Sequence, residues 1–244
     1  MGSTYTIKKV TPKHVALIMD GNGRWSKKHG VTRLSGHNAG MKAMEEIVRY
    51  SSNIGIQYLT VYAFSTENWK RSEDEVGGIF KLLVKFVGLD LSELVEENVR
   101  VRILGDSEKI PSYAAESLHK TLLKTKDNTG MQFNIAINYG SRAEICRSVN
   151  KIAARIRSGN LTGDITEDMI SRFLYTGEEN DDIPDPDLII RTSGELRLSN
   201  FLLWQGAYSE LAFTPVLWPD FTPEIFQRII DEYAHRDRRF GGRK

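Results

Sequence analysis

The 244-residue chain contains one cysteine, Cys146, so it cannot form an internal disulfide, and this usage fits a reducing compartment. Cys146 lies in the helix-like stretch SRAEICRSV, where we expect a small buried side chain rather than a reactive thiol. No window approaches the ~20 apolar residues that a membrane-spanning helix requires. The first residues, MGSTYTIKKVTPKH, lack the apolar core of a signal peptide. These absences predict a cytoplasmic protein.

An excess of charge of either sign is also lacking. Lysine and arginine number 33 against 32 aspartate and glutamate residues, which gives a formal net charge of +1. A general nucleic-acid-binding protein usually carries a strong basic excess, so we expect no nucleic-acid partner, and any recognition of an anion must be local. No internal repeat, low-complexity tract or long linker interrupts the sequence, which favours a single domain.

Short apolar runs alternate with helical patterns along the chain. We expect strands at 14–19, 58–64, 99–104, 132–138, 187–191 and 210–213, and helices near 38–53, 74–97, 111–126, 141–158, 166–175 and 222–236. Strands that alternate with helices predict crossover connections. The fold class is therefore α/β, with a mostly parallel sheet covered by helices.

Ligands bind such sheets beyond the carboxyl ends of the strands, and polar segments follow three of the expected strands there. In the first, ALIMDGNGRW, an apolar strand runs into two glycines between Asp20 and Arg24. The amides around these glycines could approach phosphate oxygens, with Arg24 adding charged hydrogen bonds. A hairpin-type Asn-Gly turn is the alternative. Arg33 and His37, downstream in RLSGHNAG, favour the anion site.

The second segment, STENWKR, follows the strand at 58–64 and places Trp69 among polar neighbours. A mobile loop that closes over a substrate is one interpretation. The other is a solvated helix start in which Ser72 caps the helix and Glu75, three residues on, completes a capping box. Both can hold together.

The third segment, RTSGELRLSN, brings Arg191, Arg197 and Ser199 to a strand end, which indicates a second anion site. Arginines paired with Glu195 at the surface are the alternative. Glu210, at the head of the last strand, could pair with a basic residue or supply a metal ligand beside Asp20. Magnesium prefers carboxylate and phosphate oxygens, so it would let Asp20 face a diphosphate.

The expected helix at 74–97 is apolar over much of its circumference and carries Gly77, Gly78 and Gly88. It either packs in the core or lines an apolar cavity. The acidic run DDIPD, at 181–185, is interrupted by proline and should be a loop rather than a helical diphosphate motif. Two anion sites, a magnesium-type acid and an apolar helix together suggest a reaction between two diphosphates, one with an apolar tail.

A dinucleotide-binding protein is a rival interpretation. It would require a G-x-G-x-x-G pattern after the first strand, and GNGRWSKKHG has no third glycine at that spacing. It also leaves the arginines of the third segment unexplained.

Six motifs resemble those of the cis-prenyltransferases, most closely the bacterial undecaprenyl diphosphate synthases: MDGNGRW, GHNAG, YAFSTENWKR, NYGSR, RTSGELRLSNFLLWQGAYSELAF and RRFGG. The likeness covers roughly residues 14–242, which would form the catalytic domain after a flexible segment, 1–13. It implies a homodimer, a six-stranded parallel-type sheet and an apolar tunnel in each subunit.

The activity that this resemblance implies is magnesium-dependent and uses two diphosphates. Successive cis condensations of isopentenyl diphosphate onto farnesyl diphosphate would give a long polyprenyl diphosphate. The product would be undecaprenyl diphosphate, the lipid-carrier precursor for cell-wall peptidoglycan synthesis. Release of the product would need at most peripheral contact with the inner face of the membrane. A synthase of different chain length, or a non-catalytic partner subunit, is the alternative, although this chain keeps the acid and the loop residues that such a subunit would be expected to lose.

Carried onto this sequence, the resemblance makes Asp20 and Asn68 catalytic, with Asn68 assisting proton removal, and makes Asp20 and Glu210 magnesium ligands. Arg191, Arg197 and Ser199 would bind isopentenyl diphosphate. The full set of implied substrate-binding residues is Gly21, Asn22, Gly23, Arg24, Trp25, Arg33, His37, Ser65, Thr66, Glu67, Trp69, Arg71, Arg191, Arg197, Leu198 and Ser199. The terminal 239–241 would reach the partner's site. The chain has Leu196 where some members carry histidine, so that position is not a metal ligand here.

Overall fold

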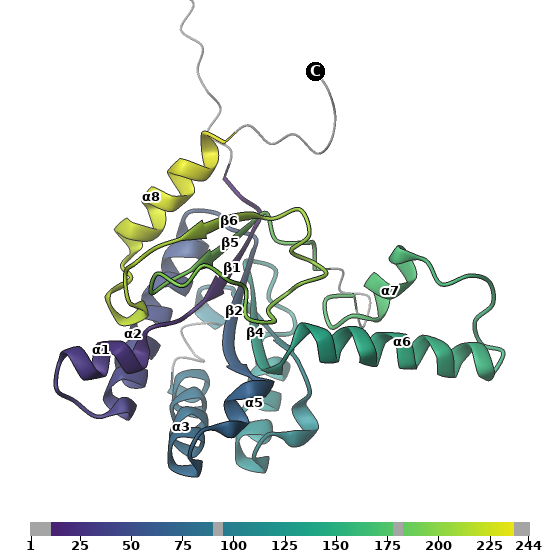
Figure 1. The fold of residues 1–244 in the computed structure, drawn as a ribbon, viewed down its shortest axis with the longest axis horizontal. Helices are drawn as coiled ribbons and strands as arrows, with labels where there is room; N and C mark the ends of the chain where they lie inside the picture. Colours follow the sequence, from purple (N-terminus) through teal and green to yellow (C-terminus); the bar gives the residue numbers. More distant parts are fainter. Residues whose placement is uncertain (1–10, 90–94, 178–182, 237–244) are drawn as a thin grey trace, which may run out of the picture.

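The computed structural model describes residues 11–89, 95–177 and 183–236. Six strands form one sheet in the order β3-β4-β2-β1-β5-β6, and every neighbouring pair is parallel (Figure 1). The strands are β1 (His14–Ile18), β2 (Tyr58–Ser65), β3 (Arg100–Leu104), β4 (Gln132–Tyr139), β5 (Leu188–Arg191) and β6 (Glu210–Phe213). The expected strands and the parallel sheet are confirmed.

Within the described residues a helix lies at each expected place, and a further helix lies at 22–28. Most bounds differ by a few residues; the helix expected at 74–97 is described as far as Leu89, and 90–94 lie outside the described residues. The helices at the expected places are α2 (Arg33–Asn53), α3 (Glu73–Leu89), α5 (Ser112–Thr125), α6 (Ser141–Arg157), α7 (Glu167–Phe173) and α8 (Pro223–Ala234). The additional helix is α1 (Asn22–Lys28), which begins inside the glycine motif. The described residues also include the short 3-10 helices η1 (Thr66–Lys70), η2 (Ser107–Lys109) and η4 (Trp218–Asp220).

Both faces of the sheet are covered, as the continuous burial of β1 requires. Val15 and Leu17 point into a large core that includes side chains from α2, α3, α5 and α8. Ala16 and Ile18 point to the other face, where Phe201 packs with them. Because β1 pairs in parallel with both β2 and β5, the carboxyl ends of these three strands lie side by side at one rim.

The close approach of α1 to α2 depends on Gly36. A Cβ added there would lie 2.3 Å from the backbone oxygen of Asn22, whereas a Cβ at Gly77 of α3 would meet nothing within 4 Å. We expect Gly36→Ala to lower the free energy of unfolding by about 2 kcal/mol through overpacking. Gly77→Ala should raise it by up to about 1 kcal/mol through helix propensity. Urea denaturation measures both, and effects of the same sign would contradict this account.

His14 is buried at the start of β1, with Nε2 2.7 Å from Thr60 Oγ1 and Nδ1 2.6 Å from the oxygen of Pro184. Burial lowers the pKa of His14 to about 4, although the Pro184 carbonyl and the charge of Asp187 favour the protonated ring. Between about pH 6.5 and pH 4 the unfolded chain therefore binds a proton that the folded chain does not, so acid favours unfolding.

We expect the free energy of unfolding to fall by up to about 3 kcal/mol as the pH drops through this window. Urea denaturation between pH 7 and pH 4 measures this, with exposed His119 as the matched control. His14→Gln should remove this part of the pH dependence and His119→Gln should retain it. An equal slope in His14→Gln and wild type would refute the assignment to His14.

Three further expectations concern positions away from the rim. Cys146 is exposed on α6, so the prediction of a buried thiol is wrong; the buried residues of that helix are Ser141, Glu144, Ser148 and Ile152. Residues 183–185 of the acidic run are irregular, while 181 and 182 lie outside the described residues. Within the described ranges, no helix combines the length and apolar character needed to cross a bilayer.

Candidate active site

Asp20 and Arg191 meet at the rim because they follow two adjacent parallel strands. Ile18 of β1 pairs in register with Arg191, the last residue of β5, and Asp20 comes two residues later. Arg191 is buried and donates from Nη2 to Asp20 Oδ2 at 2.9 Å. Burial would raise the pKa of Asp20, but the bond and charge of Arg191, with the charge of Arg24, hold that pKa below its usual value. Asp20 is therefore an ionised carboxylate.

Arg191 also binds the third segment. Its Nη1 donates to Ser199 Oγ at 2.7 Å and to the carbonyl oxygen of Arg197 at 2.5 Å. Its Nε is buried with no hydrogen-bond partner among the described residues. The Arg197 side chain is exposed and pairs with Glu195, as the alternative of a surface ion pair predicted. Arg191, by contrast, lies at the strand end where an anion site was expected.

The glycine motif forms the turn from β1 into α1. Gly21 has φ +118°, and a Cβ there would lie 3.0 Å from backbone atoms of Leu217 and Trp218, so only glycine fits. Neither a hairpin turn nor an open loop is formed, because Asn22 starts a helix. Arg24 in that helix lies 3.2 Å from Asp20 Oδ2 and from Glu195 Oε1.

A second basic group lies across the hollow from Asp20. Arg33 and His37 of α2 and Arg71 after η1 all face Glu75 of α3, at 2.9, 3.4 and 2.8 Å respectively. Burial lowers the pKa of His37, and the nearby arginines add to this, while Glu75 opposes it. A rim hollow of ≈ 510 Å³ is lined by Met19, Asp20, Gly21, Asn22, Gly23, Arg24, Lys27, Arg33, His37, Arg71 and Glu75.

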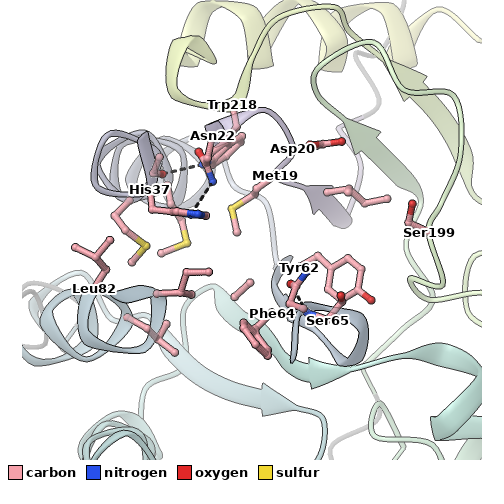
Figure 2. Close-up of a pocket in the computed structure, with 18 of the residues that line it drawn as sticks. Met19, Asp20, Asn22, His37, Tyr62, Phe64, Ser65, Leu82, Ser199 and Trp218 are labelled. Carbon is pink, nitrogen blue, oxygen red and sulfur yellow. Dashed lines mark hydrogen bonds between the residues drawn. The ribbon is translucent and has the colours of Figure 1, made fainter. Parts of the chain in front are cut away.

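An apolar cavity of ≈ 550 Å³ continues from this rim hollow between α2, α3 and the sheet, and Figure 2 shows it. Met19, Asp20 and His37 line both spaces. In Figure 2, Asp20 and Ser199 lie on one side of the mouth, with Asn22 and His37 on another. The apolar walls are formed by Met19, Met41, Met44, Tyr62, Ala63, Phe64, Ile79, Phe80, Leu82 and Leu83. Helix α3 therefore lines the cavity and also packs in the core.

Residues Thr66–Lys70 of the segment STENWKR form the 3-10 helix η1, and the interpretation of a loop that closes over a substrate stays a prediction. Ser65 and Asn68 form the capping box of η1, with Ser65 N donating to Asn68 Oδ1 at 2.9 Å. Trp69 donates from Nε1 to Asn138 Oδ1 at 2.8 Å and stacks on Phe80. Ser65, Glu67, Asn68 and Arg71 line the cavity. The rim side of this segment is thus held in place by ordinary hydrogen bonds and ring contacts.

Several expected site residues lie away from both spaces. Trp25 donates to Asp220 Oδ1 at 2.7 Å and stacks on His29. Thr66 bonds Glu67, and Leu198 packs partly buried against the core that contains Ile18. These side chains support the rim segments and do not line the hollow or the cavity. The terminal 239–241 lies outside the described residues.

Glu210 stands at the opposite end of the sheet from Asp20. Glu210 is the first residue of β6 and pairs with Leu188, the first residue of β5. Asp20 lies two residues beyond Ile18, which pairs with Arg191 at the other end of β5. Along the strand direction the two acids are therefore roughly 17 Å apart. Glu210 Oε2 accepts from Arg236 Nη1 at 2.8 Å. Asp20 and Glu210 of one chain are therefore too far apart to share a magnesium ion, and Glu210 has the basic partner that the sequence left as the alternative. A metal role for Glu210 stays a prediction.

Thr192 and Glu75 are among the rim residues that the sequence analysis missed. Thr192 brackets Asp20: Asp20 N donates to Thr192 Oγ1 at 2.9 Å, and Thr192 Oγ1 donates to the Asp20 carbonyl at 2.6 Å. Glu75 was considered only as a helix cap. Its i,i+4 spacing from Arg71 was a signal for an ion pair between these two residues. Nothing in the local sequence indicated that Arg33 and His37 would also contact Glu75.

Known proteins resemble this chain over nearly its full length. A sequence model of the family described as "Putative undecaprenyl diphosphate synthase" matches residues 18–241. An isoprenyl transferase of Halalkalibacterium halodurans is 53% identical over 95% of this chain and 89% of its own length. One of Clostridium perfringens is 49% identical over 98% and 93%.

Solved structures agree with this relation. The lavandulyl diphosphate synthase of Lavandula x intermedia, solved in complex with dimethylallyl diphosphate, matches with a TM-score of 0.91 and 36% identity, covering 95% of this chain and 99% of that one. A "probable undecaprenyl diphosphate synthase" of Campylobacter jejuni matches with a TM-score of 0.77 and 34% identity, covering 96% and 100%. The chain therefore belongs to the undecaprenyl diphosphate synthase family and is a cis-prenyltransferase enzyme.

Proposed function

We propose that this enzyme condenses isopentenyl diphosphate with farnesyl diphosphate in successive cis additions and makes undecaprenyl diphosphate. The observation that carries the proposal is the direct connection between a basic rim hollow and an apolar cavity, through shared residues such as Asp20 and His37. Such a connection suits a molecule with a diphosphate head and a hydrocarbon tail. The family relation supports prenyl diphosphates as the substrate class.

The two diphosphates would be divided between the two basic groups. Arg24, Arg33 and Arg71 around the rim hollow would hold the allylic diphosphate. Arg191, with Ser199, would hold isopentenyl diphosphate, since the fork of a guanidinium matches phosphate oxygens. Such positioning brings the alkene against the carbon that ionises and removes an entropic part of the barrier. Asn68, at the cavity wall, would assist removal of the proton from the isopentenyl unit.

A magnesium ion fits the residues at Asp20. Mg²⁺ is usually held by one or two carboxylates together with substrate phosphates, and Asp20 is an ionised, partly exposed carboxylate at the hollow. No cluster of three histidine, cysteine or acidic side chains in the described part of the chain could hold the ion alone. When bound, magnesium would stabilise the negative charge of the departing diphosphate. The diphosphate itself would complete the coordination.

The proposed homodimer would use the face beside β6, the edge strand of the sheet. Leu196 and Tyr208 are among the most exposed large apolar side chains of the described residues, and Leu203 and Leu211 lie exposed in the same segments.

We place the enzyme in the cytoplasm, with peripheral membrane contact at most when the product leaves.

Incubation of the purified chain with farnesyl diphosphate, labelled isopentenyl diphosphate and magnesium tests the proposal. We expect undecaprenyl diphosphate as the main product on sizing by chromatography, and none after chelation of the metal. The close structural match to a lavandulyl diphosphate synthase favours one second candidate, a synthase of short products. Label confined to short products would establish that candidate, and unreacted label would refute prenyl transfer between these substrates.

A further inference from the structure

Glu75 gathers three basic side chains that come from different parts of the chain. Its Oε2 accepts from Arg33 Nη1 at 2.9 Å, and its Oε1 accepts from Arg71 Nη1 at 2.8 Å and lies 3.4 Å from His37 Nε2. The Glu75 side chain is only 11% exposed. Burial alone would raise the pKa of Glu75, but the bond from Arg33 and the charge of Arg71 hold it below its usual value. Glu75 is therefore a charged carboxylate at working pH.

This carboxylate is not used to cap its own helix. Glu75 lies in the first turn of α3, where its backbone N–H donates to Ser72 Oγ at 3.4 Å. A capping box would turn the carboxylate back toward Ser72. Instead it points across to α2 and Arg71, while Glu73 and Asp74 of the same turn are exposed. The orientation of Glu75 thus belongs to the rim.

The contacts of Glu75 occupy the donors that a diphosphate would need. Arg33, His37, Arg71 and Glu75 line one rim hollow, on the other side of which Asp20 is already paired with Arg191 and Arg24. Phosphate oxygens and a carboxylate compete for the same guanidinium N–H groups. Two anions at this separation also repel each other, most strongly where water is partly excluded.

We propose that Glu75 is a displaceable counter-ion at the allylic diphosphate site, an inference that rests on the proposed function. Without substrate, Glu75 holds Arg33, His37 and Arg71 at one place. When a diphosphate binds, its oxygens replace the Glu75 carboxylate as the acceptors for the two arginines. The repulsion that remains weakens diphosphate binding. Each condensation leaves inorganic pyrophosphate at this site. Because its affinity is lowered by this repulsion, the pyrophosphate can dissociate before the next allylic diphosphate binds. Glu75 is thus a positioning residue that sets the exchange of diphosphates.

Calorimetric titration of the full chain with inorganic pyrophosphate tests this without catalysis. Glu75→Gln keeps the size and hydrogen-bonding ability of the side chain but removes its charge, so it should bind pyrophosphate about ten-fold more tightly than wild type. Glu73→Gln, in the same turn, is the matched control and should change the dissociation constant by less than about two-fold. Unchanged or weaker binding by Glu75→Gln overturns the proposal.

Glu75→Asp separates charge from shape, because it shortens the side chain by one methylene and keeps the carboxylate. We expect its pyrophosphate affinity to lie nearer to wild type than that of Glu75→Gln. Equal tightening in both variants would assign the effect to shape and refute the counter-ion. Thermal unfolding of each variant verifies that the chain is folded.

Turnover gives a readout that a merely structural role would not produce. For Glu75→Gln, both KM for farnesyl diphosphate and kcat should fall, since tighter binding slows pyrophosphate release. A raised KM contradicts the proposal. If wild type itself does not bind pyrophosphate, the diphosphate site of the proposed function fails as well. If wild type binds it and Glu75→Gln binds no tighter, only the role of Glu75 fails.

Discussion

Asp20→Ala is expected to lower kcat by about 10³-fold or more while the chain stays folded. The carboxylate is the ionised group at which the proposed magnesium ion and the allylic diphosphate would meet, and the other acid that lines the rim hollow, Glu75, is already paired with Arg33 and Arg71. Incorporation of labelled isopentenyl diphosphate at saturating substrate measures the loss.

Removal of Asp20 also leaves the buried Arg191 without its carboxylate, so some stability should be lost. Asp20→Asn is the better-folded comparison, because its amide oxygen can still accept from Arg191, and it should lose nearly as much activity as Asp20→Ala. Asp168→Asn is the matched control, since Asp168 is an exposed acid paired with Arg172 on α7. Near-wild-type turnover in Asp20→Asn would rule out a role for this charge.

Arg191→Gln is expected to reduce kcat/KM for isopentenyl diphosphate by about 10³-fold. The guanidinium organises the rim from a buried position, with Nη2 on Asp20 and Nη1 on Ser199. Its Nε is a buried donor without a hydrogen-bond partner among the described residues, which leaves capacity for a phosphate oxygen. Initial rates over a range of isopentenyl diphosphate concentrations, at fixed farnesyl diphosphate, measure the effect.

Arg191→Lys should rescue little of this activity, because an ammonium cannot make the forked contacts of a guanidinium. Arg172→Gln, which removes an exposed arginine from α7, is the control and should keep wild-type rates. If Arg191→Lys were fully active, charge alone would suffice at this position. That result would contradict a directional role for the guanidinium.

The sheet could be predicted from the sequence because its signal is local. Buried parallel strands such as β1 and β4 are continuous apolar or small-polar runs between helical patterns, and their ends determine which polar segments share a rim. The meeting of Asp20 with Arg191 follows from that topology alone. Helix α1 escaped prediction because glycine disfavours helices, and its seven residues depend on packing against α2.

The site contacts that the sequence did not indicate share one physical cause: they join residues that are far apart in the chain. Glu75 fitted a capping pattern, yet its carboxylate is held by Arg33, 42 residues away. Trp69 sits among polar residues in the sequence, and nothing local indicated its contacts with Asn138 and Phe80. Glu210 is near Ser199 in sequence, but residues 200–209 return the chain to the amino end of the sheet, where the parallel strand β6 begins with Glu210.

The methionines in the cavity wall suit a guest that changes size. Met19, Met41 and Met44 line the space between α2 and the sheet. A thioether side chain is unbranched and has three rotatable bonds, so it could change conformation at little energetic cost as the hydrocarbon chain of the proposed product lengthens beside it. Met19 and Met41 are partly exposed, so their sulfurs can be oxidised, and a sulfoxide would place a polar group where the hydrocarbon of the proposed substrate would lie. Oxidative damage would then spoil accommodation of the tail while leaving the charged rim intact.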